Sequence, residues 1–147
     1  MLVAAMLTLA AQAAPWAAYH NDRFGFTVCY PRGLLKPKPE SGSGDGRVFG
    51  ASDGAELRAY GEFHGEEDGS LAKRIRDLDQ ELAGKGAVIS YKVQRPGWAV
   101  RSGTIGAKVF YYKLRAIDDR VLDFDFSYPR AAAARWKPIA ARMEKCF

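Results

Sequence analysis

The sequence is poor in the residues on which most catalytic and metal sites depend. Its 147 residues include only 2 cysteines and 2 histidines. Cys29 and Cys146 do not form the Cys-x-x-Cys spacing of redox motifs, and His20 and His64 stand alone in the chain. Zinc sites need three or four ligands, usually at short characteristic spacings. We therefore expect neither a metal site nor a cofactor.

Long hydrophobic runs are also missing, except near the start of the chain. Residues 1–13 carry no charged side chain and end in the small-residue pattern Ala-Gln-Ala, which is typical of a signal peptide and its cleavage site. A transmembrane helix needs about 20 apolar residues, and Gln12 and Pro15 interrupt this run. We expect residues 1–13 to be removed and residues 14–147 to form a single domain, secreted or periplasmic, without a permanent transmembrane helix.

Charge is distributed unevenly along the chain. The formal net charge is +5, from 22 Lys and Arg against 17 Asp and Glu. Residues 95–147 hold 11 of the basic and 5 of the acidic residues, so this segment alone carries +6. An envelope protein or an anionic polymer of the cell envelope is a candidate partner, and a soluble monomer with a basic bias is the simpler interpretation. The export signal disfavours nucleic acid as a partner.

Alternating apolar residues predict an antiparallel sheet of about six strands. In residues 121–128, Leu122, Phe124, Phe126 and Tyr128 point to one side, and polar residues point to the other. The dipeptide Asp53-Gly54 predicts a two-residue type I′ turn between two strands. The other predicted strands are residues 24–30, 47–52, 55–63, 87–94, 98–102 and 108–117.

Two segments have helical periodicity. Asp68-Gly69-Ser70 offers an N-cap, and the apolar stripe that follows consists of Leu71, Ile75, Leu78 and Leu82. Residues 131–147 have helical composition, and Pro138 is tolerable there in a first turn. Ile139, Met143 and Cys146 lie on one stripe of this helix, which we expect to face the sheet. The predicted fold class is therefore α+β, with two main helices packed on an antiparallel sheet.

The two cysteines are interpreted as a disulfide. They lie 117 positions apart, one on a predicted strand and one on a predicted helix, in a chain that carries an export signal. Disulfides persist in oxidising compartments, so a Cys29–Cys146 bridge would pin the last helix to the first predicted strand. A hydrolase dyad of Cys29 with either histidine is geometrically possible but has no supporting motif.

One acidic pair has a placement that chemistry could use. Asp123 and Asp125 share one face of their strand, as a general acid and base could. Lys113 and Arg115 share a face of the preceding strand, so cross-strand ion pairing explains the pattern without catalysis. We predict no catalytic residue.

Aromatic and basic residues are interleaved in the second half of the chain. Rings beside arginine commonly bind sugars and anionic polymers, although rings in a covered sheet usually belong to the core. The candidate binding surface consists of Arg95, Trp98, Arg101, Lys113, Arg115, Arg135 and Trp136.

Four segments together resemble a known fold. They are YHNDRFGFTVCYPRGL, SGSGDGRVFGASDGAELRAYG, WAVRSGTIGAKVFYYKLR and FSYPRAAAARWKPIAARMEKCF. They look like a group of small exported bacterial proteins of unknown function and like the PsbP-like (Ran-binding Mog) fold. The resemblance implies an α/β/α sandwich on an antiparallel sheet, used for binding or scaffolding rather than chemistry.

The function expected from the sequence is that of a secreted or periplasmic accessory domain. We expect a non-enzymatic binding or envelope-associated role, with the domain stabilised by one disulfide. The alternative is a small hydrolase, or a binder of anionic lipid or polymer that uses the basic C-terminal half.

Overall fold

A computed structural model describes residues 15–64 and 70–147, in which the chain forms two α-helices and nine strands. The predicted signal peptide, residues 1–13, and part of the predicted N-cap, Asp68-Gly69, lie outside the described residues. The helices are α1 (Leu71–Gly84) and α2 (Ala133–Glu144), the second preceded by a 3₁₀ turn at Arg130–Ala132. The strands are β1 (Trp16–Asn21), β2 (Phe26–Pro31), β3 (Lys36–Pro37), β4 (Gly46–Gly50), β5 (Glu56–Phe63), β6 (Val88–Arg95), β7 (Trp98–Ile105), β8 (Lys108–Ile117) and β9 (Arg120–Pro129).

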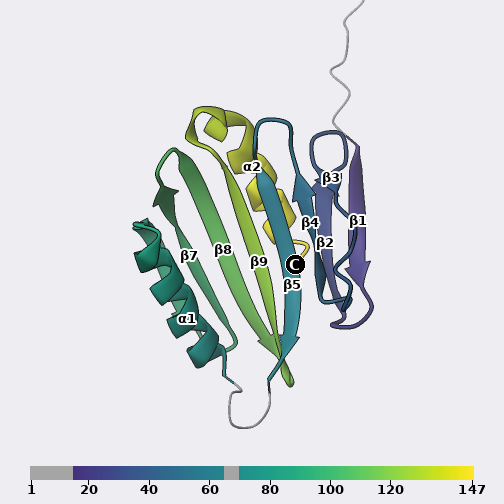
Figure 1. The fold of residues 1–147 in the computed structure, drawn as a ribbon, viewed down its shortest axis with the longest axis vertical. Coiled ribbons are helices and arrows are strands. Elements are labelled where there is room, and N and C mark those ends of the chain that lie inside the picture. The colour runs from purple at the N-terminus through teal and green to yellow at the C-terminus, as the bar shows by residue number, and fades with distance from the viewer. Residues whose placement is uncertain (1–14, 65–69) are drawn as a thin grey trace, which may run out of the picture.

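The strands form two antiparallel sheets (Figure 1). The main sheet has the order β3-β4-β5-β9-β8-β7-β6, and β1 pairs only with β2. The prediction of about six strands was therefore too low. It missed β1, whose sequence WAAYHN alternates weakly, and β3, which is only 2 residues long.

Each face of the main sheet is covered over only part of its width. On one face, α1 packs on β7 and β8 through Ile75, Leu78 and Leu82. On the opposite face, α2 and the β1–β2 ribbon pack over β4, β5 and β9. The two covers therefore lie on opposite faces and toward opposite edges of the sheet, and each face keeps an uncovered part.

The first helix follows the sequence prediction. Ser70 caps it, since its hydroxyl accepts a hydrogen bond from the backbone N–H of Lys73 at 3.0 Å. Ile75, Leu78 and Leu82 are buried against Ala99, Phe110 and Leu114 of the sheet. Local periodicity was sufficient here because the whole apolar stripe lies on one helix.

The second helix packs through aromatic residues. Trp136 is fully buried, with its ring centroid 5.5 Å from that of Phe126. Its indole N–H donates to Asp53 Oδ2 at 2.7 Å, which ties α2 to the β4–β5 turn and lowers the pKa of Asp53. Phe147 continues this contact beyond the helix, 5.8 Å from the ring of Phe26.

Three local expectations were wrong. Asp53-Gly54 does not form a type I′ turn, which requires positive φ at both central residues, because only Gly54 has a positive φ, of 92°. Pro138 lies inside α2 rather than in its first turn. Cys146 follows the end of the helix and is exposed, and the buried positions of α2 are Trp136 and Met143.

The predicted disulfide is present. Cys29 on β2 is bonded to Cys146, with Cα atoms 5.7 Å apart, so the covalent link joins the β1–β2 ribbon to the end of α2. Within the described residues, no helix is long and apolar enough to cross a membrane.

Gly61 on β5 provides the first test of the packing. A Cβ at this position would overlap the ring of Phe24 in the core. We expect Gly61→Ala to lower the free energy of unfolding by about 1–3 kcal/mol, because the ring must move out of a packed core. Gly84→Ala is the matched control, since a Cβ there meets no atom within 4 Å and a helix favours alanine over glycine by up to about 1 kcal/mol. Urea denaturation compares the variants, and an equal effect of the two substitutions would contradict this packing.

Candidate functional site

Four of the seven predicted surface residues share one face of the sheet. Trp98 pairs across the strands with Arg95 on one side and Arg115 on the other, so the three side chains point to the same face. Lys113 lies on this face too, with its ammonium 6.0 Å from the centroid of the Trp98 ring. This is the α2 face of β6, β7 and β8, at the margin of the area that α2 covers.

The other three predicted residues do not join this group. Arg101 points to the α1 face and is 1% exposed, with Nε donating to Asp79 Oδ1 at 2.7 Å. It lies three residues from Trp98, and alternation along a strand places such residues on opposite faces. Trp136 is in the core, and Arg135 is exposed on α2. The prediction that Arg101 and Trp136 belong to a surface was therefore wrong.

The structure adds an exposed aromatic residue to the four that gather. Tyr91 on β6 pairs with Ser102 on β7, which places its side chain on the same face as Trp98. Tyr91 is 53% exposed and Trp98 37% exposed. We call Tyr91, Arg95, Trp98, Lys113 and Arg115 the basic–aromatic face.

Two of its cations are already engaged within the protein. Lys113 Nζ donates to Glu144 Oε1 at 2.6 Å, and the Arg115 guanidinium lies 5.4 Å from the centroid of the Phe147 ring. The buried Nε of Arg115 has no hydrogen-bond partner among the described residues. A groove of about 330 Å³ borders the face along α2, lined by Ser102, Tyr111, Tyr128, Lys137, Ala140, Ala141, Glu144 and Lys145.

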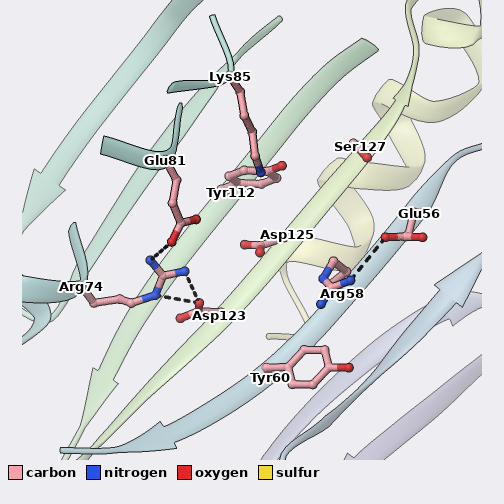
Figure 2. A pocket seen from close by; sticks show the side chains of 10 residues that line it. All are labelled: Glu56, Arg58, Tyr60, Arg74, Glu81, Lys85, Tyr112, Asp123, Asp125 and Ser127. Atoms are coloured by element: carbon pink, nitrogen blue, oxygen red, sulfur yellow. Dashed lines mark hydrogen bonds and ion pairs between the residues drawn. The ribbon is translucent and has the colours of Figure 1, made fainter. Parts of the chain in front are cut away.

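A polar cleft lies on the opposite face of the sheet (Figure 2). It has a volume of about 480 Å³ and is open where α1 stops covering the sheet. Three strands form its floor, and the α1 residues Arg74 and Glu81, with the cap residue Lys85, form one wall. The floor consists of Glu56, Arg58, Tyr60, Tyr112, Asp123, Asp125 and Ser127.

Arg74 anchors the helix to this floor. Its Nε and Nη2 both donate to Asp123 Oδ2, at 2.9 and 2.7 Å. The same guanidinium lies 3.6 Å from Glu81 and 3.9 Å from Glu62. One arginine therefore balances several carboxylates at this end of the cleft.

Asp125 is the unusual group of the cleft. Its Oδ1 is buried and has no hydrogen-bond partner among the described residues, and the same holds for Asp123 Oδ1. Burial, with the charge of Asp123 as a second cause, raises the pKa of Asp125 to about 7. Burial also raises the pKa of Asp123 to about 6, although Arg74 opposes the shift.

The predicted ion pairing of these aspartates with Lys113 and Arg115 was wrong. The β8–β9 register pairs Lys113 with Phe124 and Arg115 with Leu122. Both cations therefore point to the α2 face, whereas Asp123 and Asp125 point to the α1 face. A two-residue turn sets this register, and a shift by one residue would have reversed it.

The cleft residues contributed by α1 and β5 were missed in the sequence. Arg74 and Glu81 lie opposite the apolar stripe of α1, where charged side chains are usually solvated, and no local pattern distinguishes Arg58 from other polar strand residues. The only available signal was the pair of aspartates on one strand face.

The remaining chemical alternatives find little support in the geometry. Cys29 is bonded to Cys146, so it is not a free thiol for a dyad with histidine. Across residues 15–64 and 70–147, no group of three or more His, Cys, Asp or Glu side chains is placed to hold a metal ion.

Comparison with known proteins identifies the fold of the chain. No protein-family model matches the chain, and no curated protein sequence does. The solution structure of cyanobacterial PsbP (CyanoP) from Synechocystis sp. PCC 6803 superposes with a TM-score of 0.66 at 14% identity. The match covers 93% of this chain and 94% of that chain. The chain therefore has the PsbP-like fold that its sequence segments resemble.

Proposed function

We propose that the protein is an exported, non-enzymatic binding domain of the cell envelope, and that its basic–aromatic face binds an anionic envelope polymer. The observation that carries the proposal is the pair of exposed rings, Tyr91 and Trp98, which lie beside the exposed Arg95, with Lys113 and Arg115 close by at the end of α2.

The location rests on two features of the chain. The Cys29–Cys146 disulfide is of a kind that persists in oxidising compartments, and residues 1–13 have the composition of a signal peptide. A periplasm or an extracellular space satisfies both.

The binding role rests on the chemistry of the face. Exposed rings offer flat apolar surfaces on which sugar rings stack, and the surrounding cations attract carboxylate or phosphate groups. The charge of the segment that carries most of this face, +6 over residues 95–147, adds a longer-range attraction. A rigid seven-stranded sheet holds the rings in place, so binding requires little ordering of the backbone.

A titration with a carboxylated polysaccharide, polygalacturonate, tests the proposal. We expect Trp98→Ala to weaken binding about tenfold, because a sugar ring stacked on the indole buries apolar surface worth on the order of 1 kcal/mol or more. Arg95→Ala should weaken binding several-fold and make it less dependent on salt. Arg76→Ala is the matched control, since Arg76 is an exposed arginine on α1.

Two results would overturn the proposal. One is the absence of salt-dependent binding to polygalacturonate and to isolated cell wall alike. The other is an equal loss of binding in Arg95→Ala and Arg76→Ala, which would mean that only net charge matters.

A further inference from the structure

The polar cleft contains more negative than positive charge. Its lining holds four carboxylates, on Glu56, Glu81, Asp123 and Asp125, and three cations, on Arg58, Arg74 and Lys85. When all seven groups are ionised, the cleft lining has one more negative charge than positive charges.

The nearby arginines are already occupied by other carboxylates. Arg74 pairs with Asp123 at 2.7 Å, and Arg58 pairs with Glu56 at 3.7 Å on its own strand. Although Arg58 lies opposite Asp125 in the β5–β9 register, no ion pair forms between them. Asp125 therefore forms no ion pair among the described residues, and the charges of Arg74 and Arg58 act on it only from a greater distance.

Asp125 also lacks hydrogen-bond donors in the part of the chain that the structure describes. Its side chain points into the cleft from the middle of β9 (Figure 2), and its buried Oδ1 has no partner among these residues. Asp123 Oδ1, on the same face, is in the same state. A buried carboxylate oxygen without a donor costs free energy, and a ligand with several N–H groups would remove this cost at both oxygens.

The shape of the site favours an organic ligand over a bare ion. The cleft has a volume of about 480 Å³, and no three His, Cys, Asp or Glu side chains among the described residues are grouped so that they could hold a metal ion. Tyr112 pairs directly with Asp125 across the β8–β9 ladder, which places an aromatic ring beside the carboxylate. Cations bind favourably to such rings.

We propose that this cleft binds a small organic cation, an alkylammonium or alkylguanidinium, with Asp125 as its ionic anchor and the ring of Tyr112 beside it. The site is separate from the basic–aromatic face, because it lies on the other side of the sheet. It also takes a ligand of the opposite charge, so either proposal can fail without the other.

Lys85 is a built-in competitor for this site. It caps the C-terminal end of α1 and belongs to the cleft lining. A flexible ammonium at the rim screens the carboxylates and occupies part of the space that a ligand needs. We expect Lys85→Met to strengthen binding of the cation several-fold, an effect that a purely structural role of Asp125 would not produce.

Calorimetric titration with n-butylammonium and n-butylguanidinium tests the proposal, with n-butanol as the neutral probe. We expect millimolar or tighter binding of at least one cation and no binding of butanol. Asp125→Asn should weaken binding at least tenfold. Asp22→Asn, which removes one negative charge from a side chain that is 99% exposed, should leave it unchanged.

The pH dependence provides a second readout. Asp125 is faced by Glu56 and Arg58 on β5, Tyr112 on β8, Asp123 on β9, and Arg74, Glu81 and Lys85 from the α1 wall. Since its pKa is about 7 in the free protein, binding of the cations should strengthen between pH 5 and pH 8. Asp125→Asn should lose most of this dependence.

Three outcomes would overturn the proposal: no binding of either cation, binding of butanol as strong as that of the cations, or unchanged affinity in Asp125→Asn. Asparagine is neutral and similar in size to aspartate, so this variant should fold. Its urea denaturation curve verifies that any loss of binding belongs to the site.

Discussion

Removal of the disulfide by the double substitution Cys29→Ser and Cys146→Ser is expected to lower the free energy of unfolding by about 2–5 kcal/mol. The bridge closes a loop over a separation of 117 positions. A constraint of this length restricts the unfolded chain strongly, with an upper expectation of about 4.7 kcal/mol from chain entropy alone. The folded state also loses the tether that holds Phe147 against Phe26 and Phe124.

Reduction of the unmodified protein is the control for this experiment. Dithiothreitol should lower the urea midpoint of the unmodified protein to that of the double variant and should leave the variant unchanged. An unchanged midpoint in the double variant would contradict the role of the bridge. Two titratable thiols in the folded, unreduced protein would contradict the bridge itself.

Asp125→Asn is expected to stabilise the protein, by an amount that grows from about pH 4 upward and is complete above about pH 7. Burial raises the pKa of Asp125 from its ordinary value of 3.8 to about 7. Between these two values the folded state binds more protons at this carboxyl than the unfolded state does, so stability falls as the pH rises. A tenfold change in the proton equilibrium corresponds to 1.36 kcal/mol, so the raised pKa of Asp125 can lower the free energy of unfolding by at most about 4 kcal/mol.

Partial contact of the cleft with solvent reduces this figure. We expect Asp125→Asn to raise the free energy of unfolding by about 2 kcal/mol at pH 8 and to leave it unchanged at pH 4. Urea denaturation from pH 4 to pH 8 measures it. Asp123→Asn should gain less at pH 8 than Asp125→Asn, because relief of the burial that raises the pKa of Asp123 to about 6 is offset by weaker hydrogen bonds from Arg74 to a neutral acceptor. An Asp125→Asn variant that is less stable at pH 8 would show that the carboxylate has a partner.

Local patterns in the sequence were enough to predict much of the fold. The stripe of Ile75, Leu78 and Leu82 predicted α1, and strict alternation over residues 121–128 predicted both faces of β9. These signals lie within single elements. The β1–β2 ribbon was not predicted in full, because Trp16–Asn21 is recognisable as a strand only through its pairing with Phe26–Pro31.

The candidate sites are formed by side chains from different strands and helices, and local sequence patterns do not show which of these side chains meet. The sequence placed Arg95, Trp98, Lys113 and Arg115 in one surface, and the structure brings them together. It also placed Arg101 there, although alternation along a strand puts residues three positions apart on opposite faces. The partner of Asp123 lies 49 positions away on α1, and no local periodicity connects the two.

The arrangement of the covers explains why both sites exist. Each helix packs over only part of the sheet, α1 over β7 and β8 on one face and α2 over β9 on the other. The uncovered part of the α1 face contains the polar cleft, and the uncovered part of the α2 face contains the exposed rings of Tyr91 and Trp98. One sheet therefore presents two candidate binding surfaces of different charge.

The central claim is that the basic–aromatic face binds anionic polymer, and mapping of amide chemical shifts by NMR during a polygalacturonate titration tests it most directly. We predict shifts concentrated at Tyr91, Arg95, Trp98, Lys113 and Arg115, together with the Trp98 indole signal, and little change along α1. Shifts centred on α1, or spread evenly over the exposed lysines and arginines, would contradict the claim.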